Sequence, residues 1–138
     1  MKNIWITGAL CLCFLAGFIL TGCEHASTTE KQGKDWDYTV VPTMDCPEEL
    51  KKQIDQKKIN AFQMTYDDGE YRYYAVGYGE QENSGFSIAV LGLYEKGDKL
   101  CLETRLNGPE EGEVVSDKPS TPYIVIKTER TDKETEFI

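Results

Sequence analysis

The chain has 138 residues, and its 15 lysines and arginines stand against 24 aspartates and glutamates, which gives a formal net charge of −9 at pH 7. Nucleic acid and anionic lipid surfaces repel so acidic a protein before any contact forms, so we exclude both as binding partners. The chain also contains a single histidine, which leaves little scope for acid–base catalysis or zinc binding by imidazole.

Residues 1–22 have the features of a bacterial lipoprotein signal peptide. Lys2 supplies a positive start, residues 4–20 are mostly apolar, and Leu20-Thr21-Gly22-Cys23 has the order leucine, small, small, cysteine. The apolar run is shorter than the roughly 20 residues that a spanning helix needs, which favours a cleaved signal over a transmembrane anchor. We therefore predict that Cys23 carries diacylglycerol, whose two acyl chains anchor the protein at the extracytoplasmic face of the cell membrane.

Residues 23–35 are expected to form the lipidated cysteine and a flexible tether. After Cys23 this segment has no apolar residue larger than alanine, so it cannot bury enough surface to fold. His25 lies in the tether, which leaves residues 36–138 without a histidine. About 100 residues can bury one core, so we predict a single domain there. Removal of Lys2 with the signal leaves 14 basic against 24 acidic residues, a net charge of −10.

The first half of the domain alternates between strand and helix patterns. Residues 36–40 alternate apolar and polar side chains and are expected to form the first strand. A helix is predicted to start at Pro47, because proline suits the first helical position and acidic residues follow it, and to end near Lys58. Two strands then follow, at residues 60–66 and 70–78, joined by an Asp67-Asp68-Gly69 turn.

The second half is organised around the uncharged stretch at residues 83–94. A turn signal precedes it and another follows, so we predict a central strand that is covered on both faces. Residues 99–106 are its expected hairpin partner, residues 123–127 a further strand and residues 134–138 a short edge strand. The elements predict an α+β domain in which six or seven mostly antiparallel strands and one short helix form a twisted sheet, sandwich or open barrel.

Three loops of this arrangement are expected at one end of the sheet, around residues 85, 109–112 and 121–123. Loops clustered on a rigid sheet commonly carry binding, so we expect partner contacts there, with Phe86 and Tyr123 as aromatic anchors and Gly85 shaping its loop through a positive φ. The alternatives are that the loops are turns only and that both aromatic rings belong to the core. The candidate contact residues are Gly85, Phe86, Pro109, Glu110, Glu111, Pro122 and Tyr123.

We find no catalytic or metal-binding arrangement. The serines of the domain lack a histidine base, and Cys46 and Cys101 are too far apart in sequence for a zinc motif. Asp67-Asp68 is typical of a turn and Glu110-Glu111 of a solvated loop. We therefore predict a protein that is not an enzyme and uses no cofactor or metal.

Cys46 and Cys101 are a candidate disulfide in an oxidising compartment. A bond between them would close a loop of 101 minus 46, or 55, steps and could contribute about 4 kcal/mol on the chain-entropy model. The alternative is two separate reduced thiols.

Three short segments resemble the C-terminal domain of PrcB-type protease-complex subunits. They are Gly85-Phe86-Ser87-Ile88-Ala89-Val90, Pro109 with Gly112, and Thr121-Pro122-Tyr123-Ile124-Val125-Ile126-Lys127. Ser84 and Phe86 depart from the Gly and Tyr of that family's first motif. The resemblance implies a small lipid-anchored partner that associates with and stabilises a surface protease, without catalysis.

Two other functions stay open. The same three loops are similar to those of chagasin-like cysteine-protease inhibitors, although the last two lie close together in sequence and the first lacks the expected Pro-Thr-Thr. A generic ligand-binding lipoprotein is the third alternative. It would need a deep pocket, for which a single small domain offers little room.

Overall fold

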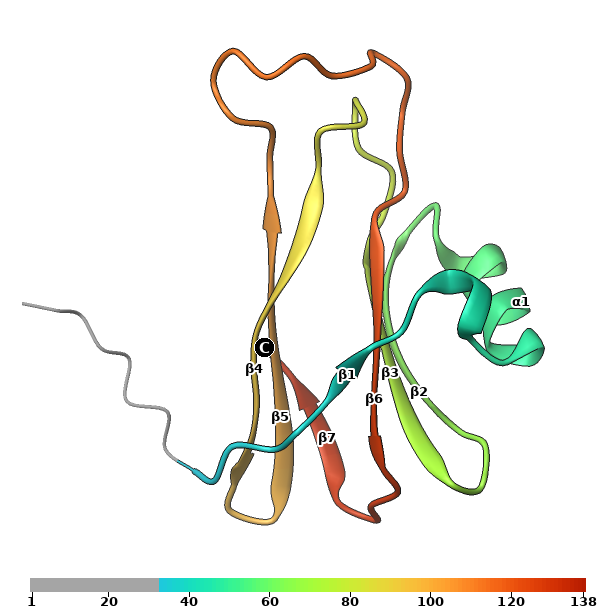
Figure 1. Cartoon of the computed structure of the whole chain (residues 1–138), viewed down its shortest axis with the longest axis vertical. Coiled ribbons are helices and arrows are strands. Elements are labelled where there is room, and N and C mark those ends of the chain that lie inside the picture. The colour runs from blue at the N-terminus through green and yellow to red at the C-terminus, as the bar shows by residue number, and fades with distance from the viewer. Residues whose placement is uncertain (1–32) are drawn as a thin grey trace, which may run out of the picture.

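The computed structural model describes residues 33–138 as seven strands in two sheets, with one α-helix and a short 3-10 helix (Figure 1). The sheets do not close into a barrel, so the prediction of a sandwich-like α+β domain with six or seven strands and one short helix is confirmed. The signal peptide, Cys23 and most of the tether lie outside the described residues. The strands are β1 (Thr39–Val40), β2 (Ala61–Asp67), β3 (Tyr71–Tyr78), β4 (Ser87–Lys96), β5 (Lys99–Asn107), β6 (Tyr123–Glu129) and β7 (Glu134–Phe137).

The four-stranded sheet has the order β1-β6-β3-β2, with every pair antiparallel. β3 and β6 occupy its centre. The consecutive β3 residues Tyr73 to Val76 are all buried, so both faces of this strand are covered. Tyr73 and Ala75 belong to the core cluster on the helix side. Tyr74 and Val76, which point to the opposite face of the same strand, belong to the cluster between the two sheets.

The helix α1 (Glu48–Lys57) covers one face of this sheet and begins directly after Pro47, one residue later than predicted. Its first turn contains Glu48 and Glu49, which complement the positive end of the helix dipole. Leu50 and Ile54 lie one turn apart on its buried face and pack with Val41, Cys46, Tyr73, Ala75 and Val125. No helix within residues 33–138 is long and apolar enough to cross a membrane.

The three-stranded sheet has the order β4-β5-β7 and covers the other face (Figure 1). β4 pairs antiparallel with β5, and β7 pairs parallel with β5. Leu93, Leu100 and Leu102 pack against Tyr74, Val76 and Ile126 of the larger sheet. The prediction that residues 83–94 form the central strand is wrong: β4 begins at Ser87 and lies at the edge of the smaller sheet, while β5 is its centre.

The segment predicted as the first strand runs from one sheet to the other. The Trp36 N–H donates to the Leu93 carbonyl at 2.8 Å, next to an isolated bridge between Asp35 and Tyr94. A few residues later Thr39 and Val40 pair with β6 of the larger sheet. The segment therefore bonds first to β4, at the edge of the smaller sheet, and then to β6 of the larger sheet. It does not form one continuous strand.

The β2–β3 hairpin has the predicted turn, and its geometry shows why Asp68 is needed. Asp68 Oδ1 accepts hydrogen bonds from the backbone N–H groups of Glu70 and Tyr71 at 2.9 and 2.8 Å, which lower the pKa of its carboxyl group. Gly69 adopts a φ of 102°. Asp68 Oδ2 accepts the hydroxyl of Tyr73 at 2.9 Å, and burial together with this carboxylate raises the pKa of Tyr73 to about 12.

The structure does not join Cys46 and Cys101; both are free and buried. Cys46 packs under α1 on the larger sheet. Cys101 lies between Leu100 and Leu102, which face the inter-sheet core, so its side chain points to the outer face of the smaller sheet. The disulfide prediction needed the start of the helix to cover that face, whereas the helix covers the far side of the other sheet.

We therefore predict that both thiols stay reduced even in an oxidising compartment. A thiol reagent should label Cys46 and Cys101 fully in protein that is denatured without a reductant. Labelling of native protein should be slow, because burial shields both thiols and raises their pKa. Labelling that appears only after reduction would show that the disulfide exists.

Candidate functional site

Two connections meet at one end of the sandwich, residues 80–86 before β4 and residues 108–120 after β5 (Figure 1). We call them together the loop end. Gln81 and Ser120 exchange two backbone hydrogen bonds, at 2.7 and 3.0 Å. The Ser84 N–H donates to the Ser116 carbonyl at 3.1 Å, and Ser84 Oγ accepts the Ser116 N–H at 2.9 Å. The predicted gathering of these two loops is therefore present, and backbone pairing holds them together.

Gly85 is required at the loop end because of close packing. A Cβ atom at this position would lie 2.6 Å from both Pro109 Cβ and Val115 Cγ1, which is too short for a carbon–carbon contact. The backbone is held by Asn83, whose Oδ1 accepts the Gly85 N–H at 2.9 Å. The expected positive φ is wrong, because Gly85 is not among the glycines with that conformation. Gly85 instead lets the two loops touch.

Phe86 lies in an open hollow of about 870 Å³ at the loop end. Its ring is half-buried and lies against Gly108, where a Cβ atom would be 3.5 Å from Phe86 Cε1. The exposed Arg105 lies at the same hollow, and its Nε donates to Asn107 Oδ1 at 3.1 Å. The lining residues are Ser84, Gly85, Phe86, Ser87, Arg105, Leu106, Asn107, Gly108, Glu110 and Glu113.

The rim of the hollow is an acidic turn. Glu113 Oε2 accepts the Glu110 N–H at 2.9 Å, the Glu113 N–H donates to the Glu110 carbonyl at 3.0 Å, and Gly112 adopts a φ of 84°. Glu110 and Glu111 are exposed, as the sequence predicted for a solvated loop. The turn therefore holds the Glu113 carboxylate in place and carries the exposed Glu110 and Glu111 beside the hollow of Phe86.

Val114 is a loop-end residue that sequence reasoning missed. Its side chain is 98% exposed, in the connection between β5 and β6. The signal was available, because Val114 and Val115 are the only aliphatic residues between Gly108 and Pro122. Val115 is partly buried near Gly85, whereas Val114 points its apolar surface into solvent.

Tyr123 does not join the loop end. The chain descends from the loop end before β6 begins (Figure 1), and Tyr123, the first residue of β6, pairs with Gly77 at the end of the β3–β6 ladder. Its ring packs against the helix-side core, and its hydroxyl lies 2.9 Å from Thr43 Oγ1. Pro122, just before it, accepts the Tyr78 N–H at 3.3 Å through its carbonyl oxygen. Of the predicted contact residues, the structure therefore brings Gly85, Phe86, Pro109, Glu110 and Glu111 together and leaves Pro122 and Tyr123 apart.

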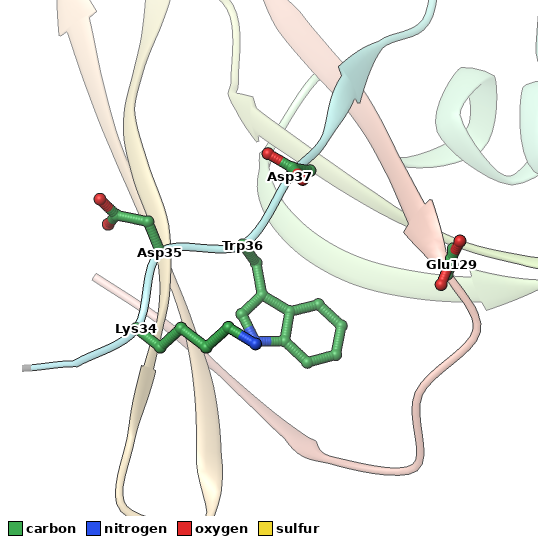
Figure 2. A pocket seen from close by; sticks show the side chains of 5 residues that line it. All are labelled: Lys34, Asp35, Trp36, Asp37 and Glu129. Carbon is green, nitrogen blue, oxygen red and sulfur yellow. The ribbon is translucent and has the colours of Figure 1, made fainter.

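A second, smaller hollow of about 310 Å³ lies where the N-terminal segment crosses between the sheets (Figure 2). Its residues are Lys34, Asp35, Trp36, Asp37 and Glu129. The Trp36 indole packs against the inter-sheet core, and its Nε1–H donates to Glu95 Oε1 at 2.6 Å. Lys133 Nζ lies 3.7 Å from the other oxygen of Glu95. These contacts fasten the N-terminal segment to β4, which gives this hollow a structural role.

The Ser84 and Ser120 hydroxyl groups of the loop end hydrogen bond to the backbone of the neighbouring loop. Ser84 serves as an acceptor for its neighbouring loop, and Ser120 Oγ donates to the Asn83 carbonyl at 2.6 Å. Within residues 33–138 no group of three or more His, Cys, Asp or Glu side chains could hold a metal ion. The loop end therefore offers an aromatic ring, an exposed aliphatic side chain and an acidic rim, which are features of a protein contact surface.

Comparison with known proteins gives one family match. Residues 72–129 match the model described as PrcB C-terminal, and they run from β3 through β6 and include the whole loop end. No curated protein and no solved structure matches the chain. The resemblance predicted from the loop motifs is thereby confirmed for residues 72–129, which are similar to the PrcB C-terminal family.

Proposed function

We propose that this chain is a lipid-anchored, extracytoplasmic subunit that associates with a surface protease and stabilises it without taking part in catalysis. The observation that carries the proposal is the family match over residues 72–129, which is consistent with a protease-associated partner. The anchor rests on Leu20-Thr21-Gly22-Cys23, the four residues that fit a lipoprotein signal.

The protease is proposed to bind the loop end. Val114 exposes an apolar side chain that would gain free energy by entering a pocket on the partner, and Phe86 offers an aromatic surface in the neighbouring hollow. The exposed carboxylates of Glu110 and Glu111 would attract a basic surface and act mainly on the association rate. This arrangement suits a partner with an apolar pocket and a basic rim.

The position of the N-terminal segment supports this orientation. The Lys34 carbonyl accepts the Glu95 N–H at 2.9 Å, near the β4–β5 hairpin, whereas the loop end lies at the other end of β4 (Figure 1). Eight residue steps along β4, from Ser87 to Glu95, separate these ends, about 26 Å at roughly 3.3 Å per residue. A lipid anchor at Cys23 would therefore attach to the domain at the end opposite the loop end.

The inhibitor alternative has less support. A chagasin-like inhibitor needs aromatic side chains from its first and third loops at one end of the sandwich. Here Phe86 lies at the loop end, while Tyr123 packs beside Thr43 on the helix side. An inhibitor would block a mature cysteine protease, whereas an assembly partner would raise the yield of its own protease.

The anchor can be tested at Cys23. The variant Cys23→Ala should accumulate as an unlipidated and unprocessed precursor, because the predicted peptidase acts after diacylglycerol is attached to that thiol. Mass spectrometry of the membrane fraction would detect this change. Acylation and cleavage at the same bond in the variant would contradict the lipoprotein proposal.

Binding at the loop end can be tested with Val114→Asp and Phe86→Ala against the co-purified protease. Each change should weaken binding about thirtyfold, because a buried anchor typically contributes roughly 2 kcal/mol or more. Val114→Asp should leave thermal stability almost unchanged, since the side chain is 98% exposed.

The matched control is Val40→Asp, an exposed valine in the four-stranded sheet. It should bind like the wild type. Unchanged affinity in both loop-end variants would reject the loop end as the contact surface. Loss of cysteine-protease activity on addition of the purified wild-type protein would move the function to the inhibitor.

A further inference from the structure

The outer edge of β2 is open along its whole length. β2 ends the order β1-β6-β3-β2, and within residues 33–138 no backbone hydrogen bond reaches its outer side. The remaining edges are shorter or partly covered. β1 has two residues, β7 has four, and residues 34–36 hydrogen bond to β4 near its C-terminal end. An exposed strand of seven residues is a template for pairing with another chain.

The ladder shows which β2 groups point outward. The Asp68 N–H donates to the Tyr71 carbonyl, so this pair is hydrogen-bonded, and such pairs alternate along an antiparallel ladder. Phe62, Met64 and Tyr66 therefore bond to β3. The backbone N–H and C=O groups of the alternate residues point away from the sheet, and the side chains of these residues are exposed. The alternate residues are Ala61, Gln63, Thr65 and Asp67.

The sequence of this edge lacks the usual protection against pairing. Residues 59–66, Ile-Asn-Ala-Phe-Gln-Met-Thr-Tyr, contain neither a charge nor a proline. Lys57 and Lys58 precede this run, and Asp67 and Asp68 follow it. Asp55 lies 2.8 Å from Lys58 and Arg72 lies 2.9 Å from Asp67. Lys57 and the second aspartate, Asp68, have no salt bridge within residues 33–138, so the two ends keep opposite charge.

We propose that β2 pairs antiparallel with β2 of a second copy of this chain, about a two-fold axis at Gln63. An antiparallel strand on this edge needs a basic N-terminal end and an acidic C-terminal end to complement the charges of β2. β2 of the chain itself has that order, because Lys57 and Lys58 lie at the end of α1, just before the turn into β2, and Asp67 and Asp68 lie at its C-terminal end. The pairing is isologous, as in most dimers, and joins two four-stranded sheets into one of eight strands.

The proposed register satisfies both the backbone and the side chains. Gln63 lies opposite Gln63 of the second copy, and Ala61 lies opposite Thr65, so that the outward N–H and C=O groups of each strand bond to those of the other. The same register puts the turn that precedes β2, with Lys57 and Lys58 at the end of α1, beside the Asp67–Asp68 end of the partner's β2. Phe62, Met64 and Tyr66 of both copies then form one apolar row on the helix side of the joined sheet.

Cysteine cross-linking of the full-length chain in membranes tests this register. Gln63→Cys should form a disulfide-linked species of twice the chain mass, because directly opposite residues of a hydrogen-bonded pair have Cα atoms about 5.5 Å apart. Thr65→Cys is the matched control. It lies on the same exposed edge, but its counterpart in the second copy is four residues away, about 13 Å, so it should cross-link at least several-fold less.

A second variant tests the backbone pairing. Adding Thr65→Pro to Gln63→Cys removes an outward N–H group, which an edge strand tolerates in the single copy, and should abolish the cross-link. The proposal is overturned if Gln63→Cys gives no dimer, or if Gln63→Cys and Thr65→Cys cross-link equally. A cross-linked species of another mass would overturn it as well, since the edge would then bind a strand of a different protein.

Discussion

The structure depends on the burial of β3 and β6 on both faces. Consecutive residues of β3, Tyr73 to Val76, are all buried. A layer on one face of the sheet would bury only every second side chain, so the strand needs a layer on each face. The helix covers the face of Tyr73 and Ala75, and the three-stranded sheet covers the face of Tyr74 and Val76. Apolar burial on this scale is the dominant favourable term in folding, and here it fixes which element lies on which side.

This layering determines which parts of the molecule remain available for binding. The loop end projects beyond the two cores, held by backbone bonds around Gln81 and Ser120, while the N-terminal segment joins β4 near its opposite end. The edges of the sheets are the other exposed backbone, and within the described residues the edge of β2 is open along its whole length, whereas residues 34–36 partly cover that of β4. The loop end and the β2 edge lie on different parts of the fold, so one copy could use both together.

The sequence predicts local structure well and placement across the fold less well. Pro47 marks the helix start and Asp67-Asp68-Gly69 the hairpin, because both signals act through neighbouring backbone groups. An uncharged run such as residues 83–94 has the same sequence pattern in a central strand and in an edge strand whose two faces are covered. The predicted central position of these residues was therefore wrong. Alternation over residues 36–40 likewise gives no sign that the chain changes sheets. The side on which Tyr123 packs, and the separation of Cys46 from Cys101, depend on which sheet α1 covers, which no local pattern records.

Native-state hydrogen exchange tests this layering most directly, because it measures the free energy needed to open each backbone hydrogen bond. The slowest amides should be those that join β3 to β6, including Tyr74 and Val76, and they should open only on global unfolding. The outward amides of Gln63 and Thr65, measured on the single copy, should exchange far faster. Slowest exchange in β4, with β3 amides opening as readily as the edge of β2, would contradict the account and restore residues 83–94 as the centre of the fold.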